Sequence, residues 1–163
     1  NTVEEVLQYG VQSLLKEMEM SEIKADAILA ERLGCPYGEA FLKIAGLRMP
    51  VDDPNGLPVC WTEIFVLTEF AGIRDRVGQG NVLIANLIEE QYGQRAMEIR
   101  QDITAVTLPN DIAAKLGLPS GSPGLLVRRW YTGPDDKAFV ITISLHPGES
   151  FSYTMQMSRN AEV

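Results

Sequence analysis

The chain has 163 residues, of which 45% are hydrophobic, and a formal net charge of −8. This size and composition predict one globular domain, and no apolar run is long enough to suggest a membrane span. A domain this acidic repels the phosphate backbone, which argues against nucleic-acid binding by the chain itself. Charged residues near its beginning argue against a signal peptide, so we expect a cytoplasmic protein: Glu4, Glu5, Lys16, Glu17 and Glu19.

Helices and strands alternate through the first part of the chain. Apolar periodicity predicts helices over 3–9, 26–33, 70–77 and 81–92. Alternating patterns predict strands over 11–20, 41–49 and 58–67. Gly34 and Gly93 follow two of the helices and are expected to end them.

The second part of the chain is richer in strands. We expect a strand over 96–107, then a short helix over 110–116 with Asn110 as its N-cap. Three strands follow, over 125–132, 138–145 and 151–157. Strands joined by tight turns pair antiparallel, so the sequence predicts an α+β fold with an antiparallel sheet flanked by helices.

An internal repeat relates the two parts. The segment Leu33–Gly38 (LGCPYG) recurs 83 residues later as Leu116–Gly121 (LGLPSG), and similar residues continue on both sides of each copy. Two copies are too few for a solenoid, where three or more repeats are needed. The repeat therefore predicts one domain with pseudo-two-fold symmetry, in which each half supplies a short helix and part of the sheet. The crevice between the halves is a natural ligand site.

Catalytic and metal-binding motifs are missing from the sequence. It has no P-loop, GxSxG, HExxH or GxGxxG pattern that opens a helix, and His146 is its single histidine. Cys35 and Cys60 form no CxxC pair and are expected to be reduced thiols. We therefore expect no catalytic residues, no metal and no cofactor, and a protein that is not an enzyme.

Polar residues recur on one side of strands that are otherwise apolar. In the strand over 138–145 and just beyond it, Thr142, Ser144 and His146 point the same way. Arginine can bind a carboxylate or another anion through two hydrogen bonds, which suits a small anionic ligand. The predicted ligand-binding residues are Arg48, Thr62, Arg129, Thr142, Ser144 and His146. The solvent-facing side of an antiparallel sheet would give the same alternation, so this alternative stays open.

An ordered set of short motifs from about residue 11 to the end resembles the UTRA domain, the effector-binding module of the HutC branch of GntR-type transcription regulators. The set includes Leu33-Gly34, Leu47-Arg48, Leu57-Pro58-Val59, Leu87–Gly93, Leu116-Gly117, Arg129, and Phe151 with Tyr153. The resemblance implies a chorismate-lyase-like fold with a small-molecule pocket over residues 1–163. It also implies that DNA is read by an N-terminal winged helix-turn-helix, which this chain does not contain. Because the chain begins with Asn rather than Met, we expect a piece of a longer regulator.

The chain departs from the family pattern at several pocket positions. Arg48 and Arg129 match family arginines, but Gly46 stands where another arginine is frequent. The other departures replace polar family residues: Thr62 and Val140 for Glu, Leu83 for Ser, and Ala85 and His146 for Tyr. These changes predict an effector more apolar than a sugar phosphate, such as a carboxylic acid held by Arg48 and His146.

The sequence therefore predicts an effector-sensing domain that acts in a homodimer through a shift in population. Arg48 would pair with the anionic group, and Thr62, Thr142 and Ser144 would form hydrogen bonds to the ligand. The alternating apolar residues of 151–157 are the candidate dimer interface. Two alternatives remain: a chorismate-lyase-like enzyme acting on an aromatic acid, and a dimerisation module with a vestigial pocket.

Overall fold

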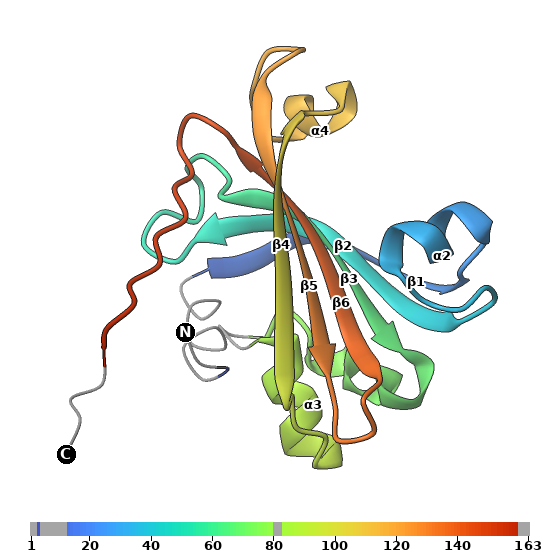
Figure 1. Ribbon diagram of the computed structural model, residues 1–163. Helices are drawn as coiled ribbons and strands as arrows, with labels where there is room; N and C mark the ends of the chain where they lie inside the picture. The colour runs from blue at the N-terminus through green and yellow to red at the C-terminus, as the bar shows by residue number, and fades with distance from the viewer. Residues whose placement is uncertain (1–2, 4–12, 80–82, 160–163) are drawn as a thin grey trace.

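The computed structural model describes residues 3, 13–79 and 83–159. Figure 1 shows a strongly twisted sheet with short helices around it. Most of the helix predicted over 3–9 lies outside the described residues, as do the first residues of the helix predicted over 81–92. The fold class is the predicted one, because every pair of neighbouring strands in the sheet is antiparallel.

The sheet has six strands in the order β1-β2-β3-β6-β5-β4. Their bounds are β1 Ser13–Lys24, β2 Ala40–Pro50, β3 Cys60–Leu67, β4 Glu98–Thr107, β5 Pro123–Thr132 and β6 Ala138–Pro147. The order reads the same from both edges when β4, β5 and β6 are matched with β1, β2 and β3. Each half thus contributes a strand, a short helix and two further strands, which confirms the predicted pseudo-two-fold arrangement.

Two helices, one from each repeat, cover the same face of the sheet. α2 (Ala27–Leu33) begins at Asp26, whose side chain accepts a hydrogen bond from the Leu29 amide, and ends at Gly34 with φ 66°. The Trp130 indole donates to the Leu33 carbonyl at 2.7 Å, which fixes α2 over β5. α4 (Asn110–Lys115) packs through Ile112 and Ala113 against Leu47 and Leu145.

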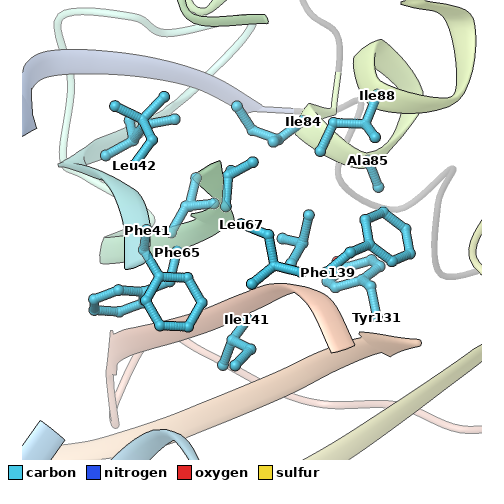
Figure 2. Close-up of a cluster of buried hydrophobic side chains, with 14 of the residues drawn as sticks. Phe41, Leu42, Phe65, Leu67, Ile84, Ala85, Ile88, Tyr131, Phe139 and Ile141 are labelled. Carbon is cyan, nitrogen blue, oxygen red and sulfur yellow. The ribbon is translucent and has the colours of Figure 1, made fainter. Parts of the chain in front are cut away.

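The segment between the two halves covers one end of the opposite face. It contains the 3-10 helix η2 (Thr68–Arg76) and the α-helix α3 (Ile84–Tyr92). Figure 2 shows Ile84, Ala85 and Ile88 of α3 lying against side chains from the strands. The apolar side of α3 thus completes the main core at one end of this face.

Three sequence-based predictions need correction. The strand expected over 151–157 is absent, since residues 151–159 have no helix or strand. β6 already lies between β3 and β5, so a strand joined to it by a tight turn would have no free edge beside it. Asn110 is not the N-cap of α4: Pro109 holds that position, and Asn110 instead accepts a hydrogen bond from the Ser120 hydroxyl. The helix expected over 70–77 is a 3-10 helix over Thr68–Arg76.

Candidate functional site

A cavity of about 350 Å³ lies at the other end of this face from α3. Its size falls within the range of small-molecule sites, which is about 300–1,000 Å³. All six residues predicted from the sequence line it: Arg48 from β2, Thr62 from β3, Arg129 from β5, and Thr142, Ser144 and His146 from β6. The structure thus gathers these side chains from both halves of the repeat around one space.

Strand alternation explains how these residues meet. Thr62 stands opposite Ser144 in the register of β3 and β6, and Arg129 stands opposite Thr142 in that of β5 and β6. Residues that pair directly across strands lie on the same face of a sheet. The residues between them point to the other face, where Trp130 meets α2 and Leu145 packs with α4.

The two arginines stand on opposite sides of the cavity floor. Arg48 donates to the Ser13 hydroxyl at 3.4 Å, and the Arg129 Nε donates to the Gln101 side-chain oxygen at 2.6 Å. Among the described residues, no carboxylate forms a salt bridge with either guanidinium. Their positive charges are therefore open to an anion that enters the cavity.

His146 is neutral at physiological pH. Burial, with the positive charges of Arg129 and Arg48 beside it, lowers the pKa of His146 to about 4, against an opposing hydrogen bond to the Val59 backbone. Only 8% of the side chain is exposed, and the imidazole stacks on the Phe151 ring with centroids 3.8 Å apart. His146 is therefore part of the cavity wall as an uncharged ring that can still form hydrogen bonds.

Cys60 and the two hydroxyls form the centre of the floor. The Thr62 and Ser144 hydroxyl oxygens lie 2.9 Å apart, and Ser144 also contacts the Cys60 thiol. Burial raises the pKa of Cys60 to about 11, although both arginines and the Ser144 hydroxyl act to lower it. The thiol is thus protonated. The charges of Arg48 and Arg129 both act on Cys60 and on His146, so the two cations converge on the same region.

Sequence reasoning missed several lining residues. Cys60 and Tyr131 share faces with Thr62 and Arg129, so alternation alone could have identified them. Ser13 and Phe151 come from other parts of the fold, and no local pattern indicates their place. Leu83, which the family resemblance had placed at a pocket position, also lines the cavity. The carboxylate of Asp52, in the exposed loop after β2, also borders the cavity, which the sequence analysis did not expect.

The position two residues before Arg48 has no room for a side chain. A Cβ atom on Gly46 would lie 2.8 Å from the Lys16 carbonyl oxygen, where the β1–β2 register shifts between Lys16 and Glu19. The backbone of β1 thus fills the space that an arginine would need there. This explains in structural terms why the chain carries glycine at this point.

The described residues contain no group of three or more His, Cys, Asp or Glu side chains arranged to hold a metal ion. None of the helices in this part of the chain has the length and apolar character needed to span a membrane.

Comparison with protein families gives one match over most of the chain. The family model described as the UTRA domain matches residues 9–152. No curated protein sequence matches the chain.

Solved structures share the fold. The effector domain of PhnF from Mycobacterium smegmatis has a TM-score of 0.71 at 22% identity, with 90% of this chain and 86% of that chain covered. The ligand-binding domain of a GntR-family regulator from Bordetella bronchiseptica has a TM-score of 0.70 at 18% identity, with 90% and 88% covered. The regulator YydK from Bacillus subtilis gives 0.70 at 18%, with 90% of this chain but only 61% of that chain covered.

Proposed function

Because the chain belongs to the UTRA domain family, the effector-binding domains of GntR-family transcription regulators, we propose that its cavity binds a small anionic effector. The observation that carries the proposal is the pair of guanidiniums, Arg48 and Arg129. Both act on the same buried groups, and no carboxylate of the described residues pairs with them. Partly buried arginines of this kind can bind a carboxylate or similar anion through two hydrogen bonds.

The remainder of the floor suits a ligand with an apolar body. Val59, Cys60, Leu83, Val127 and Tyr131 supply apolar surface, and the hydroxyls of Thr62, Thr142 and Ser144 supply hydrogen bonds. A few polar anchors in an apolar cleft are enough for a specific small-molecule site. This composition supports a carboxylic acid, rather than a heavily hydroxylated sugar phosphate, as the effector of a regulator of the HutC branch.

Calorimetric titration of wild type and Arg48→Ala with a panel of small aromatic and aliphatic acids tests the proposal. The variant leaves the ligand's charge unpaired in a shielded cavity, at a cost of about 2–5 kcal/mol, or roughly a 30- to several-thousand-fold loss of affinity. Arg48→Lys recovers only part of the loss, because lysine cannot form the two-pronged pair. Equal affinity of wild type and Arg48→Ala for the best acid would contradict the anion site.

We further propose that the full regulator is a homodimer whose N-terminal domain, not this chain, contacts DNA. A two-fold protein suits an operator with two half-sites. Tyr153, Met155 and Met157, on the segment after Phe151, are large apolar residues that are 42%, 51% and 81% exposed. We propose these side chains as the dimer interface. Sedimentation at micromolar concentration is expected to show a dimer that Met155→Glu weakens, and a monomer alone in wild type would contradict the proposal.

The same cavity is proposed to bind without catalysis. A chorismate-lyase-type reaction needs an acid held at the leaving group. Asp52 is the one carboxylate that lines the cavity among the described residues, and it lies in an exposed loop rather than on the floor. Incubation with chorismate is expected to give no 4-hydroxybenzoate above the uncatalysed background, and measurable product would favour the enzyme.

A further inference from the structure

Each arginine that lines the cavity keeps two neighbouring donors unengaged. Arg48 donates through Nη1 to the Ser13 hydroxyl, and Arg129 donates through Nε to the Gln101 side chain. Within the described residues, Nε and Nη2 of Arg48 and both Nη atoms of Arg129 have no hydrogen bond, and none of them is buried. Two adjacent donors of a guanidinium match the two oxygens of a carboxylate. Each arginine therefore offers its own place for an anionic group.

The strand registers place the two arginines at diagonally opposite corners of the cavity floor. Arg48 on β2 stands opposite the residue two before Thr62 on β3, and Arg129 on β5 stands opposite the residue two before Ser144 on β6. Thr62 and Ser144 face each other, and their strands run antiparallel. The arginines thus lie on opposite sides of this hydroxyl pair, both across the sheet and along the strands. Across the sheet their backbones are three strand spacings apart, or about 14 Å.

The cavity does not balance the charge of the two guanidiniums. Cys60 and His146, on which both positive charges act, are themselves uncharged. Asp52 is the one carboxylate that borders the cavity among the described residues, and it forms a salt bridge with neither arginine. A single carboxylate has two oxygens and so fills one pair of donors, which leaves the second guanidinium without a counter-charge. A ligand with two anionic groups fills both pairs.

We propose that the effector carries two anionic groups, as a dicarboxylic acid does, and that Arg48 binds one of them and Arg129 the other. The inference rests on the proposed anion site and adds the class of ligand: an elongated diacid rather than a simple acid. The middle of the ligand lies over Thr62 and Ser144, whose hydroxyl oxygens are 2.9 Å apart at the centre of the floor. The apolar side chains that line the cavity then contact its carbon skeleton.

Matched acids test this proposal by calorimetry. Each diacid (succinate, glutarate, adipate, phthalate and terephthalate) is compared with its monoamide, which keeps the size and shape but loses one charge. We expect at least one diacid to bind wild type about 10- to 150-fold more tightly than its monoamide, since the amide gives up the charged hydrogen bonds to one arginine. In Arg129→Gln this ratio should fall to about one, because the monoamide can turn its carboxylate toward the arginine that remains.

Three further variants separate a specific contact from the general effect of charge. Arg48→Gln should lower the ratio to about one independently of Arg129, and Arg129→Lys should keep part of it, because lysine keeps the charge but lacks the fork. Arg100→Gln removes an equal charge from β4 on the other face, where Arg100 stacks on Trp130 and bonds to Asp102. It should leave the diacid preference unchanged, and an equal loss in Arg100→Gln would overturn the inference.

The outcomes separate the two proposals. Acids that bind in an Arg48-dependent manner without any preference for the diacid, or with one that survives Arg129→Gln, would overturn the second anionic group and leave the anion site standing. Failure of every acid to bind wild type would refute the anion site, and the diacid proposal with it.

Discussion

One end of the face that bears the cavity is packed with apolar side chains, whereas the other end holds arginine, histidine and hydroxyl groups. The internal repeat makes the two ends equivalent, because the first and second halves of the sheet are related by the pseudo-two-fold. Pairs of residues that face each other across neighbouring strands show the contrast. Leu42–Val66 at the apolar end corresponds to Leu125–His146 at the polar end. Tyr131–Val140 at the apolar end likewise corresponds to Arg48–Cys60 at the polar end.

The cover over the strands, rather than the strands themselves, accounts for the difference. The connection between the halves contains η2 and α3, which bury the apolar end (Figure 2). The described residues that follow the second half, up to 159, contain no helix, and they pass the other end as an extended chain (Figure 1). Side chains beneath a helix must be apolar, since buried polar groups are costly, whereas those beside a cavity are free to be polar. A symmetric sheet thus has a cavity where its cover is not repeated.

The largest expected contrast is between two equivalent leucines. Leu42 is 1% exposed in the core, while its counterpart Leu125 is half-buried. Leu42→Ala is expected to lower the free energy of unfolding by about 2–5 kcal/mol, because it leaves a void under the helices. Leu125→Ala should cost less than half as much. Urea unfolding of both variants measures the difference. Equal losses of unfolding free energy would contradict the expected contrast between the two ends.

The polar end should also make stability depend on pH. Folding lowers the pKa of His146 from 6.5 to about 4, so between these values the unfolded chain binds a proton that the folded chain does not. The contribution is complete above pH 6.5 and is lost as the pH falls to 4, by about 3 kcal/mol. His146→Phe should lack this component. Because the chain has one histidine, NMR titration of its ring reads the pKa directly.

Gly46 and its repeat counterpart Arg129 give a third contrast. Gly46→Ala brings a Cβ atom against the backbone of β1 and is expected to cost about 1–3 kcal/mol of stability. Arg129→Ala removes a hydrogen bond to Gln101 at the cavity, so its loss should be about 1 kcal/mol. Thermal unfolding ranks the two variants by stability. A Gly46→Ala variant as stable as wild type would show that the backbone of β1 shifts easily where its register with β2 changes.

The smallest effect concerns the rate of thiol modification. Burial raises the pKa of Cys60 to about 11, and the pKa of the less buried Cys35 is raised too, also mainly by burial. A thiol reagent at pH 8 should therefore label Cys35 first and Cys60 mainly after unfolding in guanidinium. Cys35→Ser isolates the Cys60 rate, which should fall further when an acid is bound. Rapid labelling of Cys60 in the native protein would show that the floor is open.

Local patterns predicted what depends on neighbouring residues. Alternation on β6 correctly placed Thr142, Ser144 and His146 on one face, and the recurring Leu-Gly motifs indicated the two-fold arrangement. That these residues bind a ligand stays a prediction. Sequence reasoning failed where the outcome depends on the position of a strand within the sheet. The alternation of Phe151, Tyr153 and Met155 is typical of a strand, but β6 already has neighbours on both sides.

The positions of Arg48 on β2 and Arg129 on β5 have a mechanical consequence. β3 and β6 lie between these two strands, so the arginines flank the seam where the halves of the repeat join. A molecule bound by both side chains would link β2 to β5 across the two strands that lie between them. It couples the two halves without any change in their backbone hydrogen bonds, and it makes opening of the sheet at that seam more costly.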